Sequence, residues 1–222
     1  TYTGESGGSF ATTKDGTKLE GKVKFDIKST GGETHLELDG NGVKADDLSI
    51  TIAPKEDTTH ERAKGLITRK SSDVNVNNLN VDVTFKDTTG KFSGSADSNA
   101  SYGVAVGYDW DGGSKTDVSR LTVNNMDVKV KNTPDTTFSI NTVTRSIFGF
   151  SITANVRFAH QLSGLKVYRK GGAKAEFVSN GNTNILVEDV SKTKSGDYLA
   201  GVYVSGEDSK AIFNGDTNIT VI

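Results

Sequence analysis

The chain has 222 residues, of which only 33% are hydrophobic, and its formal net charge is −2, from 26 basic and 28 acidic side chains. The length suits one or two all-β domains, and the 25 glycines beside only 2 prolines indicate many turns between short strands. The balanced charge and the absence of cysteine argue against a nucleic-acid partner, zinc–thiolate sites and disulfide bonds, and we expect no metal and no other cofactor.

The N-terminal region, residues 1–34, fits the repeat described below poorly. Its segment GKVKFDI at 21–27 alternates polar and apolar residues, as a half-buried strand does. We predict that residues 1–34 form a first coil or an extension, followed by stacked coils over residues 35–222. Residues 47–52, Asp-Leu-Ser-Ile-Thr-Ile, resemble the closing strand of the repeat.

Two stretches near the C-terminus repeat each other. Residues 164–187 read GLKVYRKGGAKAEFVSNGNTNILV, and residues 201–221 read GVYVSGEDSKAIFNGDTNITV. Each begins with Gly and a short apolar alternation, continues with Lys-Ala-x-Phe, and closes with Asn-Gly-[Asn/Asp]-Thr-Asn-Ile-x-Val. Fainter copies occupy residues 65–83 and 103–130. A repeat of this length indicates stacked structural units, because one unit cannot bury its own apolar face.

The spacing of the repeat predicts an insertion. The opening glycines stand at positions 65, 103, 164 and 201, so the steps between them are 38, 61 and 37 residues. We predict an inserted segment at about 131–163, with the apolar stretch SIFGFSITANVRF at 146–158 forming an extra coil. Its phenylalanines suit the core. If they remain outside, they form a hydrophobic contact patch flanked by Arg145 and Arg157, as interfaces often have.

Each unit contains three short strands with period-2 alternation, separated by turn residues, and no segment has a helical period. The predicted fold is therefore all-β, a right-handed parallel β-helix (a solenoid of three-strand coils) with variable loops. Four asparagines, Asn77, Asn124, Asn180 and Asn214, recur at similar places in the units. Asparagine tolerates left-handed backbone at a corner, and stacked asparagines can hydrogen bond between coils. We predict a polar ladder there, which can also serve self-association.

The unit Gly201–Val221 resembles the coils of passenger domains of bacterial type V autotransporters, which are large surface adhesins. The resemblance covers roughly residues 36–222 and is strongest over 160–222. It implies export, passage through an outer-membrane barrel absent from this sequence, and display at the cell surface. The implied function is adhesion or self-association. The implied partners are a host or bacterial surface receptor, a glycan, matrix, or another copy of the chain.

The candidate ligand-binding cluster is Tyr108, Asp109, Trp110 and Asp111, in a Gly-rich turn after the strand 103–106. It holds the only tryptophan, which can stack on a sugar ring or anchor a protein partner. The two aspartates alternate as in a calcium loop, but the later oxygen ligands of such a loop are missing. The alternative is a long turn with Trp110 folded against the coil.

Two other functions compete with adhesion. Many β-helical enzymes degrade polysaccharides with carboxylates converging on one sheet face, but the acidic pairs here, such as Asp46-Asp47 and Glu207-Asp208, fall at different places within the unit. No Gly-x-Ser-x-Gly motif supports a hydrolase, and His35, His60 and His160 lack metal-ligand spacing. We therefore predict no catalytic residues. A glycan-binding phage tailspike is the second alternative, and it requires a trimer.

Overall fold

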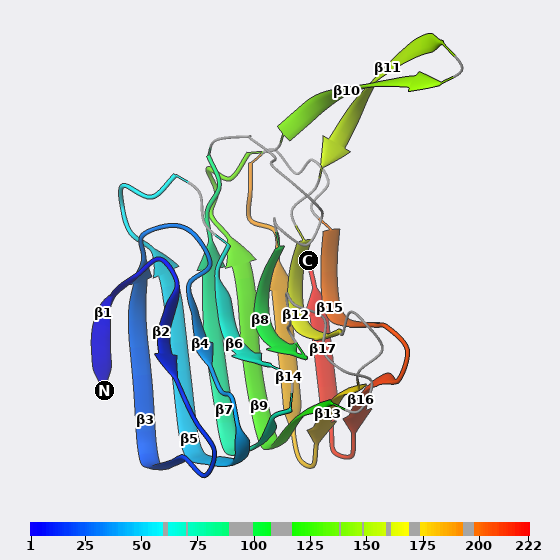
Figure 1. Cartoon of the computed structure of the whole chain (residues 1–222). Coiled ribbons are helices and arrows are strands. Elements are labelled where there is room, and N and C mark those ends of the chain that lie inside the picture. Colours follow the sequence, from blue (N-terminus) through cyan, green and yellow to red (C-terminus); the bar gives the residue numbers. More distant parts are fainter. Residues whose placement is uncertain are drawn as a thin grey trace.

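The computed structural model of the chain describes residues 1–59, 62–69, 71–88, 100–107, 117–137, 139–147, 149–158, 161–168, 174–192 and 198–222. Within these ranges the chain forms strands and turns without any helix (Figure 1). The predicted all-β class is therefore confirmed.

Two parallel sheets contain nearly all of the strands. Sheet A contains β1 (Tyr2–Ser6), β3 (Lys18–Ser29), β5 (Asn41–Pro54), β7 (Asp73–Phe85), β9 (Val118–Asn132), β13 (Lys174–Ser179), β14 (Thr183–Glu188), β16 (Ser209–Phe213) and β17 (Thr217–Val221). Sheet B contains β2 (Ser9–Thr12), β4 (His35–Glu37), β6 (Lys64–Thr68), β8 (Ala100–Val106), β12 (Gln161–Tyr168) and β15 (Tyr198–Ser205). A separate antiparallel hairpin consists of β10 (Ser139–Ile147) and β11 (Phe150–Phe158).

The chain alternates between the two sheets. Each coil places one strand in sheet B and then one long strand, or two short ones, in sheet A. Successive coils pair in parallel, as β5 does with β7 and β8 with β12. The arrangement is consistent with a β-solenoid, and it makes each coil bury the apolar face of its neighbour. Residues 1–34 contribute β1, β2 and β3 to the same two sheets.

The long strands of sheet A change their alternation at one point. In β7, Val74 and Val76 are buried, and the next buried residue is Leu79. Asn77 and Asn78 therefore both lie outside the core, although side chains of a regular strand alternate between faces. The same two-residue step recurs in β5 and β9. It divides each long strand into two segments.

The C-terminal coils have three residues at this step, and there the strand is interrupted. Ser179 pairs with Val123 and Thr183 with Met126, so Asn180, Gly181 and Asn182 lie opposite only two residues of β9. A Cβ atom on Gly181 would lie 2.5 Å from the backbone oxygen of Asn124. Glycine is required here because the neighbouring backbone is so close.

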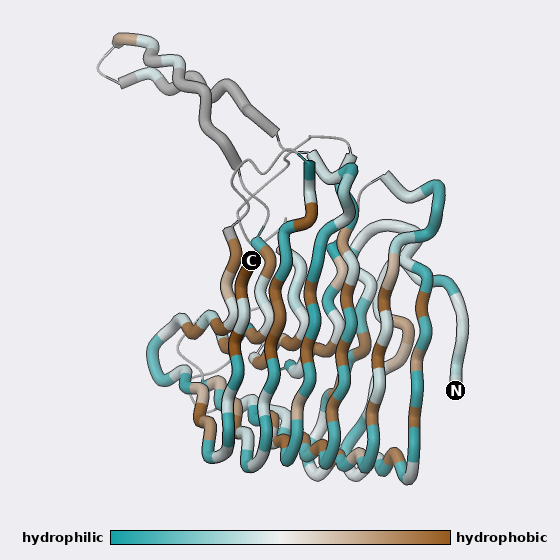
Figure 2. Tube along the Cα trace, turned by 180° about the vertical axis from the view of Figure 1, so that it is seen from behind, coloured by the Kyte–Doolittle hydropathy of each residue, from teal (hydrophilic) through white to brown (hydrophobic). Residues whose placement is uncertain are grey.

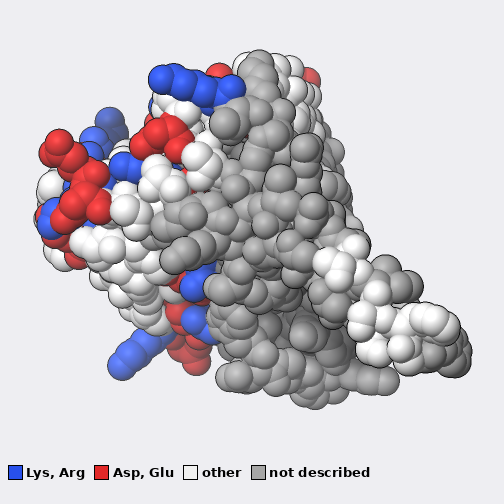
Figure 3. Space-filling view, turned by 90° about the horizontal axis from the view of Figure 1, so that it is seen from above, with Lys and Arg blue, Asp and Glu red and all other residues white. Residues whose placement is uncertain are grey.

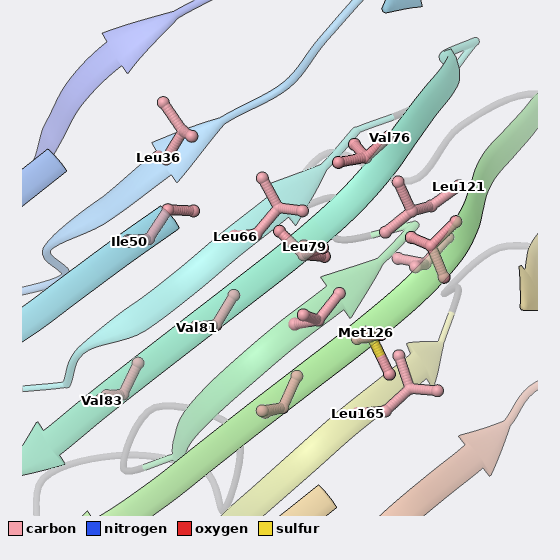
Figure 4. Packing of buried hydrophobic residues seen from close by; sticks show 14 of the residues in the cluster. Leu36, Ile50, Leu66, Val76, Leu79, Val81, Val83, Leu121, Met126 and Leu165 are labelled. Carbon is pink, nitrogen blue, oxygen red and sulfur yellow. The ribbon is translucent and has the colours of Figure 1, made fainter. Parts of the chain in front are cut away.

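The core is a continuous stack of apolar side chains between the sheets. Leu36, Ile50, Leu66, Val81 and Leu165 belong to it and are at most 1% exposed (Figure 4). Figure 2 shows the alternation of hydrophobic and hydrophilic residues along the long strands. Each fully buried side chain of this kind contributes about 1.5–3 kcal/mol, which compensates for the low overall hydrophobic content.

The repeated glycines lie where the two sheets approach each other closely. A Cβ atom on Gly65, Gly103, Gly164 or Gly201 would collide with a valine or isoleucine of sheet A: Val81, Val128, Ile185 or Ile219, respectively. None of these glycines has a positive φ. Glycine is therefore needed at these positions because sheet B lies so close to sheet A there. A turn is not the reason for it.

The long step in the repeat contains the hairpin β10–β11. It spans Ser139–Phe158, pairs with neither parallel sheet, and projects from one end of the strands (Figure 1). The sequence suggested an extra coil at this place. A coil needs a parallel register with its neighbours, whereas the turn at Gly149, with φ of 82°, folds the segment back onto itself.

Candidate binding groove on sheet A

The two-residue step places two columns of polar side chains on the outer face of sheet A. Column 1 consists of Asp46, Asn77, Asn124, Asn180 and Asn214, and column 2 of Asp47, Asn78, Asn125, Asn182 and Asp216. Because successive coils are about 4.8 Å apart, side chains at one register position lie within hydrogen-bonding distance of each other. Both columns follow from one sequence feature, two polar residues between apolar alternations, with a glycine between them in the two C-terminal coils.

The four asparagines selected from the sequence all lie in column 1. The Asn124 amide nitrogen donates to the Asn77 Oδ1 at 2.6 Å, and Asn214 donates to Asn180 at 3.0 Å. At the N-terminal end of the column, the Asp46 carboxylate accepts a hydrogen bond from the backbone N–H of Gly21 at 2.8 Å. The four side chains are exposed, so these bonds leave room for outside partners.

Column 2 was missed by the sequence analysis. Asn78 donates to the Asp47 Oδ1 at 2.6 Å and accepts from Asn125 at 2.9 Å. The Asn125 Oδ1 in turn accepts the backbone N–H of Asn182 at 3.1 Å. The signal was present, since Asn77-Asn78 and Asn124-Asn125 are adjacent pairs in equivalent strands. A strictly alternating strand places only one member of such a pair on the outer face.

A groove of about 640 Å³ runs across the coils beside column 2. Its polar lining residues are Thr1, Lys22, Lys24, Asp47, Ser49, Asn78, Asn80, Asn125, Asp127, Asn182 and Asn184. A second hollow of about 410 Å³ borders column 1, with Lys44, Asp46 and Asn77 among its lining residues. The columns therefore separate two open polar depressions, and both depressions extend over several coils.

The larger groove carries charges of both signs along its length. Lys22 and Lys24 lie on β3, in the first coil, and both are exposed. Asp47 lies one coil further and Asp127 three coils further, on β9. The strands between contribute Ser49, Asn78 and Asn80, together with the Asp47 carboxylate, which lies in register with Lys22. In the row that reads Lys24, Ser49, Asn80 and Asp127, the lysine and the aspartate are three coil spacings apart, roughly 14 Å.

The third hollow, at the C-terminal end of sheet A, contains an ion-pair cluster. The Glu176 carboxylate lies 2.9 Å from the Lys210 Nζ and 3.2 Å from the Arg120 Nε. Burial opposes ionisation of Glu176, but the hydrogen bond from Lys210 and the Arg120 guanidinium together keep the pKa of Glu176 below its usual value. This cluster joins three successive coils, so it stabilises the stack.

The predicted cluster of Tyr108, Asp109, Trp110 and Asp111 lies outside the described residues, as do His60 and His160. The aromatic patch is described only in part. Phe150 is 76% exposed at the tip of the hairpin, so it does not belong to the core. No group of acidic and histidine residues suited to a metal ion occurs among the described residues, and the same ranges hold no helix able to cross a bilayer.

The outer face of sheet B carries a cluster of buried charges that the sequence did not indicate. Lys64 is fully buried, and its Nζ lies 3.0 Å from the Glu33 carboxylate. Beside it, the Arg69 Nε lies 2.9 Å from Glu37. Burial lowers the pKa of Lys64 to about 8, although the Glu33 carboxylate raises it. Burial likewise lowers the pKa of His35.

Three tyrosines surround a second buried lysine on this face. Leu165 and Val167 point into the core, so Lys166 points to the opposite side, where it is 2% exposed. Its Nζ donates to the Tyr102 hydroxyl at 2.7 Å and lies 4.9 Å and 5.4 Å from the ring centres of Tyr168 and Tyr203. Cation–π attraction thus replaces part of the lost hydration of the lysine.

The outer faces of the two sheets therefore differ in what they offer to a partner: sheet A has open polar grooves, and sheet B has enclosed charges. Comparison with known proteins adds no relative, because no family model, no curated protein and no solved structure matches this chain.

Proposed function

We propose that the chain is a segment of a right-handed parallel β-helix from the surface-displayed passenger of an autotransporter-type adhesin, and that it mediates adhesion by self-association. The observation that carries this proposal is the groove beside column 2, in which amide, hydroxyl and charged side chains recur at one-coil spacing. An identical array on a second copy has the same spacing, so many weak polar contacts can form at once.

The charge distribution supports pairing between two copies in opposite directions. In a two-fold arrangement centred between β5 and β7, the first coil of one copy faces the fourth coil of the other. Lys22 and Lys24 then face Asp127 of the second copy, and the reverse pairing forms by symmetry. The amides between them, such as Asn80, are exposed and can act as both donors and acceptors. Rim charges of this kind determine register and partner choice.

The test is a charge swap measured by analytical ultracentrifugation and by the sedimentation of cells that display the chain. We expect wild-type chains to associate, and we expect Lys22→Glu combined with Lys24→Glu to abolish association, as Asp127→Lys should. Mixing the two variants should restore it, because each supplies the charge that the other has lost. The matched control is Lys28→Glu, on the same strand outside the groove, which should leave association intact.

Two results would remove the proposal. A chain that stays monomeric at all concentrations and does not sediment cells lacks the activity. Association that survives both charge reversals uses another surface.

Degradation of polysaccharide is the second candidate function, and it rests on sheet B. Glu33 and Glu37 converge there with Arg62 and Arg69, whose side chains are 29% exposed, and such carboxylates and cations can bind uronates or protonate a glycosidic oxygen. Incubation with a panel of polysaccharides, with and without calcium, should then release reducing or unsaturated ends. The loss of this release in Glu37→Gln would assign it to sheet B, and a panel without release would exclude the activity.

A further inference from the structure

The four asparagines of column 1 differ in the residue that follows each of them. Asn77 and Asn124 precede another asparagine inside the continuous strands β7 and β9. Asn180 and Asn214 precede glycine in the connections β13–β14 and β16–β17, which lie side by side at the lower edge of Figure 1. Glycine has no side chain, so its backbone nitrogen is poorly shielded. In an Asn-Gly pair this nitrogen can attack the side-chain amide carbon of the asparagine.

Both glycine nitrogens are available in the folded chain. Neither the Gly181 N–H nor the Gly215 N–H donates a hydrogen bond within the described part of the chain. The N–H groups that follow the other two asparagines lie inside the parallel ladder between β7 and β9, where backbone groups are paired. Both glycine-flanked asparagines are exposed, so water reaches their side chains. The fold therefore leaves only these two members of column 1 open to attack.

The hydrogen bond between the two asparagines makes them unequal. The Asn214 Nδ2 donates to the Asn180 Oδ1 at 3.0 Å. This bond polarises the amide carbon of Asn180 and stabilises the negative charge that an attack places on its oxygen. The amide nitrogen of Asn180 takes no part in this bond and is able to leave. The amide nitrogen of Asn214, in contrast, is the donor and is held in place.

We propose that Asn180 is a site of self-modification, at which the Gly181 nitrogen attacks the side-chain amide and converts the asparagine to aspartate or isoaspartate. A bond forms between the Gly181 nitrogen and the Asn180 Cγ, and the Cγ–Nδ2 bond breaks. The proton of the attacking N–H passes through water to the departing nitrogen, which leaves as ammonia. Water then opens the resulting cyclic imide at either carbonyl and gives a carboxylate. Water is the only co-reactant, and nothing is oxidised or reduced.

The reaction changes the charge of column 1, in which only Asp46 is an acid. On the face shown in Figure 3, by contrast, the described charged side chains of both signs lie near one another. Asn180 lines the hollow of about 410 Å³, together with Lys44 and Asp46. A carboxylate at position 180 adds a second acid to this hollow. The surface of sheet A therefore becomes more acidic as the chain ages.

The hydrogen-bond direction allows this charge at one position and opposes it at the other. An aspartate at position 180 still accepts the bond from Asn214, as the amide did. An aspartate at position 214 has no donor and places two acceptors together. Asn180→Asp should therefore leave the midpoint of urea denaturation almost unchanged, whereas Asn214→Asp should lower it. A loss of stability in Asn180→Asp alone would contradict this direction.

The test of the reaction is incubation of the folded chain at mildly alkaline pH, followed by peptide mass spectrometry and an assay for ammonia. We expect Asn180 to react first, Asn214 more slowly, and Asn77 and Asn124 not at all. Asn214→Ala should slow the reaction at Asn180 roughly fivefold, the effect of one exposed hydrogen bond. The matched control is Asn218→Ala, which removes the corresponding bond of 3.2 Å to Asn184 and should not change the rate.

The chain unfolded in guanidinium chloride provides the reference, because there the two Asn-Gly pairs have lost the ladder and should react at similar rates. The proposal is overturned if the folded chain keeps Asn180 intact while the unfolded chain modifies it. Equal rates at Asn180 and Asn214 in the folded chain, or an unchanged rate in Asn214→Ala, would also overturn it. Both reacting groups belong to one chain, so the outcome does not depend on self-association.

Discussion

The outer faces of the two sheets are built by the same coils and are used in opposite ways. On sheet A, one register row reads Asp47, Asn78, Asn125, Asn182 and Asp216, so that chemically similar side chains lie above one another. On sheet B, one row reads Glu37, Ile67, Ala105, Lys166 and Tyr203, with no two residues alike. Sheet A is repetitive and open, whereas sheet B is specific and enclosed.

This difference shows that stacked coils can be joined by two kinds of side-chain contact, between like residues and between unlike residues. A row of amides is self-complementary, because each member donates to one neighbour and accepts from the next. A row of unlike residues needs a particular partner in each coil, and its charges are buried only where that partner is present, as Glu33 is for Lys64. Losing a side chain should therefore have a small effect on sheet A and a large one on sheet B.

The largest contrast is expected between two glutamates of similar partial exposure. Glu33→Gln removes the carboxylate beside the fully buried Lys64 and should lower the free energy of unfolding by about 3 kcal/mol. Glu188→Gln removes a carboxylate 3.5 Å from Lys129, whose side chain is 38% exposed, and should cost less than about 1 kcal/mol. Urea denaturation monitored by circular dichroism measures both. Equal effects would mean that the enclosure of sheet B has no energetic consequence.

The second contrast concerns pH. Burial lowers the pKa of Lys64 in the folded chain to about 8, from 10.5. Between these values the unfolded chain binds more protons, so stability should rise with pH, by on the order of 3 kcal/mol at most. Lys64→Met should remove this rise, whereas Lys24→Met on sheet A should keep it. The pKa of His35 is also lowered, so this side chain changes its charge below pH 6.5 and does not contribute to the rise. Denaturation midpoints from pH 7 to 11 provide the measurement, and a flat profile for the wild type would contradict it.

The repeat made sheet A predictable, because it exposes the same residue type at the same position of each coil. Asn77, Asn124, Asn180 and Asn214 could be selected from the sequence, and the stacked parallel strands followed from the apolar alternation around them. Column 2 was missed because a regular strand cannot expose two neighbouring side chains on one face. Only the two-residue step in the long strands of sheet A permits this. The adjacent asparagine pairs were the available signal.

The sheet B cluster could not be predicted in the same way. Its members, such as Glu33, Lys64 and Lys166, come from different coils and share no sequence pattern, and they meet only after the coils are in register. The hairpin shows a related limit. Its period-2 alternation is the same for a coil strand and for an antiparallel strand, so the sequence alone did not determine which one residues 139–158 would form.

The smallest expected effect is within sheet A, where Asn78 and Asn80 separate stability from binding. Asn78 makes two hydrogen bonds between coils, to Asp47 and from Asn125, and Asn78→Ala should lower the free energy of unfolding by about 1–2 kcal/mol. Asn80 is exposed in the same groove two residues further along β7, and Asn80→Ala should change stability by less than about 0.5 kcal/mol. If the groove binds a second copy, Asn80→Ala should still weaken association, because its amide faces outward. A variant that associates normally would restrict the interface to the charged ends of the groove, and one that unfolds more easily would show that Asn80 belongs to the framework of the coil.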